Sequence, residues 1–304
     1  KDPIEVKKAL KQALIEATQN TFEKVALTWF NLKSHSWSQF HSKEIIRRLR
    51  KDVFPHVGGK NISVITSDEL LLILQGIQDR GALETAHRVL QYCNSIFRFE
   101  RVEKNPASYL SDRLKAAPKN KHYATITDEK KIGQLLRAIV GYEGYPFVKY
   151  ALKLAPLVFV RPGELRQAEW SEFNLEGVNP EWRIPAEKMK MKQLHLVPLA
   201  PVVVSILLEL KPITGEGKYL FPSIRTSHRC ISNHTINAAL RLLGFTKEEI
   251  TGHGFRAMAS TLLHEKGWAS NVIERQLAHG ERNAIKAAYN HAEYLEERRK
   301  MMLW

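Results

Sequence analysis

Residues 253–289 read HGFRAMASTLLHEKGWASNVIERQLAHGERNAIKAAY. His253 and Arg256 are three residues apart, and His279 precedes Tyr289 by ten positions. On a helix, residues at i and i+3 share a face, so His253 and Arg256 can reach one substrate group together. A guanidinium offers a planar fork of donors that suits phosphate oxygens, and an imidazole beside it can move a proton or add a hydrogen bond. The pair predicts a phosphate ligand, with ordinary surface or core residues as the alternative.

The charge of the chain points to the same class of ligand. The 304 residues contain 46 Lys and Arg against 32 Asp and Glu, a net charge of +14. Such an excess favours a polyanionic partner, with nucleic acid first and an anionic membrane surface second. A basic surface without a specific partner is the alternative. The length favours two domains over one small core.

Several classes of site and of cellular location are excluded by what the chain lacks. The two cysteines, Cys93 and Cys230, are far apart, which argues against a disulfide framework or a thiolate zinc site and suits a reducing cytoplasm. The longest nearly apolar run, residues 154–160, is too short to span a bilayer. No phosphate-binding glycine loop or nucleophile elbow occurs, and Trp268 breaks the only candidate zinc motif. We therefore expect no metal, no ATP and no membrane partner.

The first half of the chain has only helical patterns. Apolar residues recur at spacings of three and four in each of the expected helices. These helices span residues 21–30, 43–53, 67–81 and 83–97. We expect Pro55 to end the second of them and Ser67 to cap the third. The prediction is an all-helical domain over residues 14–114, preceded by a connector over residues 1–13.

The second half adds a small sheet. Residues 115–126 are basic, contain a proline and lack apolar periodicity, so we predict a linker there. Over residues 127–304 the pattern is mostly helical, with three short apolar runs between turn residues that predict an antiparallel meander. Helices are expected at residues 127–140, 144–160, 201–210 and 232–243, and strands at residues 173–175, 182–184 and 194–199. The fold class is mainly α with two domains.

Arginine, histidine, lysine and tyrosine are the reactive residues that remain in the second half. Phosphoryl transfer without a metal needs positive donors for the charge on the phosphate oxygens, a nucleophile, and an acid for the leaving alkoxide. Arginines can supply the charge that magnesium supplies elsewhere. These residue types therefore fit metal-free phosphoryl transfer.

Five short motifs in this half resemble those of the tyrosine recombinases, the phage integrase family, in order and spacing. They are Arg161-Pro162-Gly163-Glu164-Leu165, Lys190 followed by Leu196-Val197-Pro198-Leu199, His253-Gly254-Phe255-Arg256, Leu277-Ala278-His279-Gly280 and Ala288-Tyr289-Asn290. The first half resembles the core-binding domain of the phage P4-like prophage and genomic-island integrases. That resemblance rests on Trp37-Ser38, Phe54-Pro55, Glu84-Thr85-Ala86 and Asn105-Pro106-Ala107. Such integrases usually begin with an arm-binding domain, which we expect to be missing because the chain starts near its end, at Asp2-Pro3.

The resemblance implies roles for individual residues. Arg161 and Arg256 would clamp the scissile phosphate, and Tyr289 would be the nucleophile that forms a 3′-phosphotyrosyl bond to DNA. His253 would take the phenolic proton, because a phenol with a pKa of about 10 needs help near neutrality. His279 would hydrogen-bond the phosphate.

Two further roles concern a carboxylate and a group of lysines. Glu164 would orient an arginine or histidine from behind. Lys190 would protonate the departing 5′ oxygen, an acid contribution on the order of 10²–10⁴-fold. If this region is a strand, Lys188 and Lys192 point the same way as Lys190, and a shift in register would choose the wrong one.

The resemblance also implies partners and alternatives. We expect a homotetramer on paired double-stranded DNA attachment sites in the bacterial cytoplasm, associated with the nucleoid, with an excisionase and a DNA-bending host factor as possible partners. Candidate DNA contacts are Arg88, Lys119, Lys121, Lys188 and Lys192. The tail after Tyr289 docks either on its own domain or on a neighbouring subunit. The alternative functions are a type IB topoisomerase-like relaxing enzyme and a DNA-binding accessory protein that does not cleave.

Overall fold

The computed structural model describes residues 20–117, 123–279 and 293–304, which fall into two compact units divided between Lys121 and His122. The predicted mainly helical fold with small antiparallel sheets is confirmed. Both ends of the predicted linker pack on the units themselves. Lys115 exchanges backbone hydrogen bonds of 3.1 and 2.9 Å with the Gln78 amide in the first unit, and Ile126 is buried in the core of the second.

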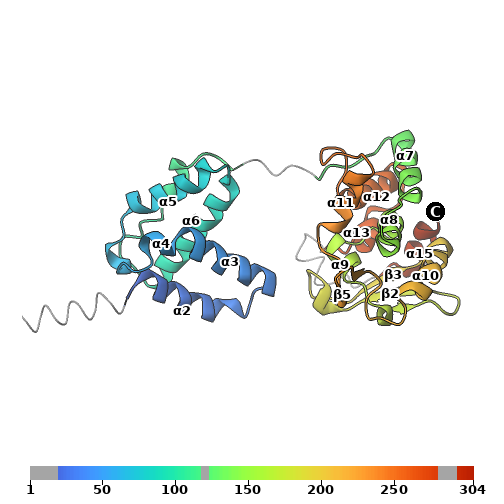
Figure 1. Cartoon of the computed structure of the whole chain (residues 1–304), viewed down its shortest axis with the longest axis horizontal. Coiled ribbons are helices and arrows are strands. Elements are labelled where there is room, and N and C mark those ends of the chain that lie inside the picture. The colour runs from blue at the N-terminus through green and yellow to red at the C-terminus, as the bar shows by residue number, and fades with distance from the viewer. Residues whose placement is uncertain (1–19, 118–122, 280–292) are drawn as a thin grey trace, which may run out of the picture. The chain divides into compact units, whose positions relative to one another are not determined.

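The first unit is a set of helices around one apolar core (Figure 1). The helices are α2 Phe22–Ser34, α3 Gln39–Asp52, α4 Phe54–Val57, α5 Ser67–Asp79 and α6 Leu83–Phe99, with short 3-10 turns at Ile62–Val64 and Leu110–Arg113. The stripe that predicted α2 is its buried face, because Phe22, Val25, Ala26 and Trp29 lie in the core.

Two predicted helix boundaries in this unit were wrong. Pro55 does not end α3, which ends at Asp52; it lies in the first turn of α4, where its missing N–H is not needed. The N-cap of α5 is Thr66 instead of Ser67. Thr66 Oγ1 accepts from the Glu69 backbone N–H, and the Glu69 carboxylate accepts from that of Thr66, which is a capping box.

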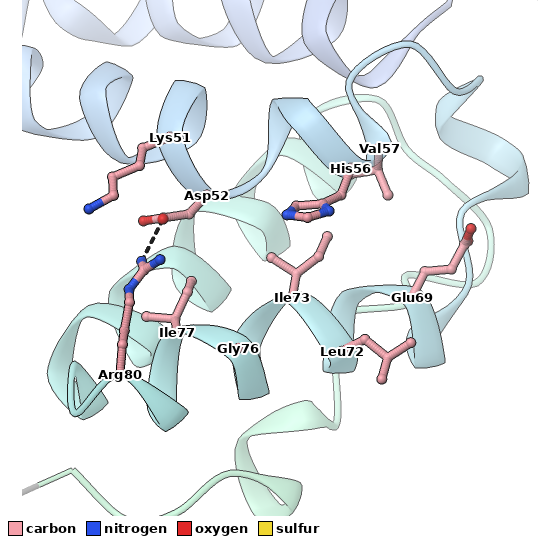
Figure 2. A pocket seen from close by; sticks show the side chains of 10 residues that line it. All are labelled: Lys51, Asp52, His56, Val57, Glu69, Leu72, Ile73, Gly76, Ile77 and Arg80. Carbon is pink, nitrogen blue, oxygen red and sulfur yellow. Dashed lines mark hydrogen bonds and ion pairs between the residues drawn. The ribbon is translucent and has the colours of Figure 1, made fainter.

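A cavity of about 380 Å³ opens between α3, α4 and α5 in this unit. Figure 2 shows Asp52 reaching Arg80 at one end of it, with apolar side chains of α5 beside the pair. The Asp52 side chain is only 3% exposed, so Arg80 supplies the partner that a buried carboxylate requires. None of the residues with a predicted catalytic role lines this cavity.

In the second unit, the other helices surround α8 (Figure 1), which contacts α7, α9, α10, α11 and α12. The helices are α7 Glu129–Val140, α8 Pro146–Val158, α9 Pro162–Arg166, α10 Pro201–Thr214, α11 Thr235–Leu242, α12 Gly254–Glu265, α13 Ser270–Gln276 and α15 Leu295–Leu303. The N-cap of α7 is Asp128, one residue after the predicted Thr127. Because α8 is buried on several sides, its sequence is apolar over most of its length.

The predicted meander is present at one side of this unit. Strands β1 Phe173–Asn174, β2 Glu181–Ile184 and β3 His195–Pro198 form an antiparallel sheet in the order β1-β2-β3, with Trp182 opposite Val197. A second hairpin, β4 Pro222–Ser223 and β5 Thr226–Cys230, was not predicted. Its strands are polar and largely exposed, so they lack the apolar alternation that marks a strand in a sequence.

The C-terminal helix α15 packs on its own domain, against α13 and β3. Its fully buried Arg298 donates from Nε to Gln276 Oε1 at 2.9 Å and from Nη2 to the carbonyl of Leu196. Met301 joins a small apolar cluster that includes Phe159 and Leu277. The side of α15 that packs on the domain therefore depends on Arg298 and Met301, while Trp304 stays exposed.

We predict that Arg298→Ala lowers the free energy of unfolding of the second unit by about 2–5 kcal/mol, because it leaves buried acceptors without a donor. Arg299→Ala is the matched control: the Arg299 side chain is partly exposed and pairs with Glu296, whose side chain is 78% exposed, so a change of about 0.5 kcal/mol or less is expected. Urea titration followed by tryptophan fluorescence measures both. Equal effects of the two substitutions would contradict an anchoring role for Arg298.

Candidate active site

The centre of the site is the guanidinium of Arg256, in the first turn of α12. The residue is 8% exposed. Its Nη1 donates to the Phe159 carbonyl at 2.8 Å, and its Nη2 donates to the Leu277 carbonyl at 2.6 Å. Burial, and next the charge of Arg161, lower the pKa of Arg256 to about 10. It therefore remains a cation near neutral pH, held by two backbone carbonyls from distant parts of the chain.

Phe159 offers its carbonyl to Arg256 because of an unusual backbone conformation. It is the C-cap of α8, with a left-handed φ of 34°. Such a conformation is uncommon for a residue other than glycine and costs on the order of 1–3 kcal/mol. The turn ends α8 and leads the chain, two residues later, to Arg161. Phe159 thus accepts a hydrogen bond from Arg256 and also turns the chain toward Arg161.

The end of α13 is a Schellman motif, which positions the other carbonyls of the site. Ala278 is left-handed at φ 49°. Its N–H donates to the Arg275 carbonyl at 3.1 Å, and the His279 N–H donates to the Glu274 carbonyl at 3.0 Å. Glycine is the usual residue at the left-handed position, so the alanine here was not a recognisable helix end in the sequence. The motif directs the Leu277 carbonyl to Arg256 and brings the His279 side chain into the site.

Arg161 is attached to the same turn. Its Nη2 donates to the Ala278 carbonyl at 2.9 Å, and its Nη1 donates to Glu164 Oε1 at 2.7 Å. The other oxygen of Glu164 accepts from the Arg161 backbone N–H at 2.8 Å. Pro162 starts α9 directly after Arg161, which lets Glu164 fold back over the N-terminus of the helix. Glu164 is therefore placed to orient an arginine, as the resemblance implies.

His279 lies between Arg256 and an acid. Its Nδ1 is 2.7 Å from Glu274 Oε2, and its Nε2 is 3.2 Å from Arg256 Nη2. Since Glu274 accepts and Arg256 donates, these contacts assign the proton of the neutral imidazole to Nδ1. His279 thus contacts the Arg256 guanidinium with its side chain, and the carbonyl of the preceding Ala278 accepts from Arg161. Glu274 was not among the residues predicted from the sequence.

His253 is the N-cap of α12, one turn before Arg256. Its ring stacks on that of Tyr123, with centroids 4.3 Å apart and an interplanar angle of 17°. Burial, and next the charges of Arg256 and Arg161, lower the pKa of His253 below its ordinary value. A neutral imidazole near neutral pH can accept a proton.

The three lysines of the hairpin do not lie on one strand face, so the strand register argument was wrong. Residues 186–188 form a 3-10 turn, and β3 begins only at His195. Lys188 Nζ bonds Glu169 Oε1 at 2.7 Å, the Gln167 carbonyl at 2.8 Å and the Glu172 carboxylate. Lys190 is exposed in the turn that follows, and Lys192 has a left-handed φ of 55°.

Lys188 is consequently a poor candidate for DNA contact. Its side chain is 18% exposed. Although burial would lower the pKa of Lys188, Glu169 and Glu172 raise it above the ordinary value, so the charge is used inside the protein. Arg88, another predicted DNA contact, forms an exposed ion pair with Glu84 on the same helix. An exposed pair of this kind is weak and can be exchanged for a phosphate.

Direct contacts therefore join Arg161 to Glu164 and Arg256 to His279, and the consecutive carbonyls of Leu277 and Ala278 hold the two pairs to one turn. His253 lies one turn before Arg256 on α12. No hydrogen bond joins Lys190 to this group among the residues that the structure describes. The predicted nucleophile Tyr289 lies outside the described residues. The predicted contacts Lys119 and Lys121 lie outside them too.

The described part of the chain also bears on metals and membranes. Within residues 20–117, 123–279 and 293–304, no group of three or more His, Cys, Asp or Glu side chains is arranged to hold a metal ion. In the same ranges, no helix is both long enough and apolar enough to cross a membrane.

Comparison with known proteins extends over both units. Residues 22–115 match the model of the phage integrase central domain, and residues 126–296 match that of the phage integrase family. The chain is 37% identical over 303 residues to the integrase of Enterobacteria phage P4, covering 93% of this chain and 68% of that protein. It is 33% identical over 307 residues to prophage integrase IntA of Escherichia coli K12, covering 100% and 73%.

Solved structures show the same fold. A lambda integrase dimer bound to a COC′ core site matches with a TM-score of 0.67 at 16% identity, over 94% of this chain and 81% of that one. A lambda integrase tetramer bound to a Holliday junction matches with a TM-score of 0.66 at 18% identity, over 87% and 79%.

We predict that Lys188→Ala destabilises the second unit by about 3–5 kcal/mol, because it leaves Glu172 buried without its cation. Glu172 is 7% exposed, and its other oxygen already accepts from Trp182 Nε1 at 2.8 Å. Lys192→Ala, in the same connection between β2 and β3, is expected to change stability by about 0.5 kcal/mol or less. Chemical unfolding of the two variants measures the difference. A stable Lys188→Ala protein would show that the ion pairs add little.

Proposed function

Since the chain belongs to the phage integrase family and is a site-specific DNA recombinase, a strand transferase that integrates a prophage, we propose that Arg161 and Arg256 bind the scissile phosphate. The observation that supports this most is that both guanidinium groups are fixed to consecutive carbonyls of one turn. Each guanidinium has several N–H donors, so the intramolecular bonds leave donors for phosphate oxygens. Neither the topoisomerase-like relaxing enzyme nor the non-cleaving DNA-binding protein is needed to explain these observations.

The proposed cleavage step is an in-line displacement at phosphorus. The phenolic oxygen of Tyr289 attacks, and His253 accepts the phenolic proton. The bond from phosphorus to the 5′ oxygen breaks, and Lys190 donates a proton to that oxygen. The products are a 3′-phosphotyrosyl enzyme and a free 5′ hydroxyl, so rejoining is the reverse attack.

The arginines stabilise the charge that develops on the phosphate oxygens in this step. Because their positions are set by backbone carbonyls and by Glu164, little reorganisation is needed when DNA binds. His279 is proposed to hydrogen-bond a phosphate oxygen, and the contact of its Nδ1 with the Glu274 carboxylate orients the ring. The covalent link conserves the energy of the phosphodiester, so no ATP is required, and the arginines supply the charge stabilisation for which other enzymes use a metal ion.

The proposed substrate is double-stranded DNA at an attachment site, which fits the net charge of +14. Structures of lambda integrase on a core site and on a Holliday junction support a tetramer of this chain on paired sites. The first unit would hold the duplex through phosphate contacts, with Arg88 among them. We place the reaction at the bacterial nucleoid in the cytoplasm, with an excisionase and a DNA-bending protein as candidate partners.

The first test of this function is covalent trapping. We expect the protein to form an adduct with a suicide substrate, a core-site duplex nicked near the crossover so that the released strand diffuses away. A denaturing gel measures the adduct. Tyr289→Phe should bind the same DNA and give no adduct, because it lacks the attacking oxygen. An adduct of normal yield in Tyr289→Phe would overturn the assignment of the nucleophile.

A second test concerns the leaving group. We expect Lys190→Ala to slow cleavage on the order of 10²–10⁴-fold, because an alkoxide leaves poorly without a proton. A substrate with sulfur in place of the bridging 5′ oxygen should restore the rate, since a thiol has a pKa of only about 8.5. Single-turnover cleavage of the two substrates measures the rescue.

Lys192→Ala is the control: as a candidate DNA contact it can change affinity, but at saturating DNA it should cleave both substrates at the normal rate. An equal deficit of Lys190→Ala on the oxygen and sulfur substrates would contradict its role as the acid.

A further inference from the structure

Residues 123–126 run along the loop that carries His253. The Ala124 carbonyl accepts from the Thr251 N–H at 3.3 Å, and Thr125 Oγ1 donates to the Gly254 carbonyl at 2.7 Å. Ile126, the next residue, is buried in the core of the second unit. We call residues 123–126 the strap. It is fixed at its inner end and bonded on both sides of His253.

The strap lies so close to the loop that only glycine fits at position 254. A Cβ atom there would be 2.3 Å from the Ala124 carbonyl oxygen, closer than any real contact of this kind. The glycine beside His253 is therefore required by the strap, independently of any contact with a substrate. The close approach fixes the path of the strap where it passes the histidine.

Tyr123 is the first residue of the strap, and its ring covers one face of the His253 imidazole. The centroids are 4.3 Å apart and the planes are within 17° of parallel, which is a stacked arrangement. Yet Tyr123 is 60% exposed, so it contributes little to the apolar core. An aromatic ring that stays exposed while it stacks on a histidine limits the orientations of that histidine.

We propose that Tyr123 is a positioning residue for His253, which holds the imidazole in the orientation that accepts the phenolic proton. This inference rests on the proposed role of His253. The strap directly follows residues 118–122, which join the two units in the sequence. Tyr123, which stacks on His253, is thus the first described residue after the segment that joins the two units in the sequence.

The charge environment of His253 gives the expected pH dependence. Facing it are Tyr123 from the strap, Arg256 on α12, and Arg161 and Glu164 at the start of α9. Burial and the two arginines lower the pKa of His253, and Glu164 opposes them. Removing the Tyr123 ring exposes the imidazole and raises its pKa. Less of the neutral base is then present at low pH, so the loss of rate should grow as the pH falls.

The test is single-turnover cleavage of the suicide substrate by the complete chain at saturating DNA, across a range of pH. We expect Tyr123→Ala to cleave about three- to tenfold more slowly, with its acid limb moved to higher pH. Tyr123→Phe keeps the stack and should restore the normal rate and profile. Tyr109→Ala removes an 86% exposed tyrosine of the first unit as the matched control, and DNA affinity should be unchanged in all three variants.

A double mutant separates positioning from general damage. In a His253→Ala background, Tyr123→Ala should cause no further loss of rate, because the residue it positions is absent. Equal losses in both backgrounds, or normal cleavage and a normal pH profile in Tyr123→Ala, would overturn the inference. Normal cleavage by His253→Ala alone would instead refute the proposed proton acceptor, a failure of the proposed function that this experiment distinguishes.

Discussion

The second unit depends on the burial of one cation, the guanidinium of Arg256. A buried charge is tolerated only where acceptors surround it, and here they are carbonyls of Phe159 and Leu277. Each carbonyl is available because a helix ends there in or beside a left-handed residue. The apolar side chains of the same two residues pack with Met301 of α15. Arg256, the C-terminal ends of α8 and α13, and helix α15 are therefore packed together.

The acids of the site have a defined place in this arrangement. The Glu164 carboxylate accepts from both the guanidinium and the backbone N–H of Arg161. The Glu274 carboxylate contacts Nδ1 of His279. Glu164 and Glu274 both offset part of the positive charge that surrounds Arg256. Neither acid bonds Arg256. The result is a cationic site in which backbone carbonyls fix the positions of the guanidinium groups and the carboxylates orient Arg161 and His279.

The sequence was sufficient for most of the helices, because amphipathic periodicity is a local property. It also singled out Arg161 and Arg256 by the chemistry of their guanidinium groups, and their role stays a prediction. The left-handed conformations of Phe159 and Ala278 could not be predicted from the sequence, because neither position is a glycine. The use of Lys188 was hidden for another reason: its acids lie 19 and 16 residues earlier, and only the fold brings them together. Tyr123 was read as part of a solvated linker, because stacking on a residue 130 positions away leaves no pattern in the sequence.

The close approach of Ala124 to Gly254 restricts where the sequences of two recombinases can be joined in a chimaera. A recombinase made from the first unit of one relative and the second unit of another has to be joined somewhere near the linker. A junction after residue 126 would pair a foreign strap with the native His253 loop. The Ala124 carbonyl lies so close to Gly254 that an added Cβ would be only 2.3 Å from it, which leaves little room for a different backbone path. A junction before Tyr123 keeps the strap with the loop it fits. Productive chimaeras should therefore inherit residues 123–126 together with the catalytic half.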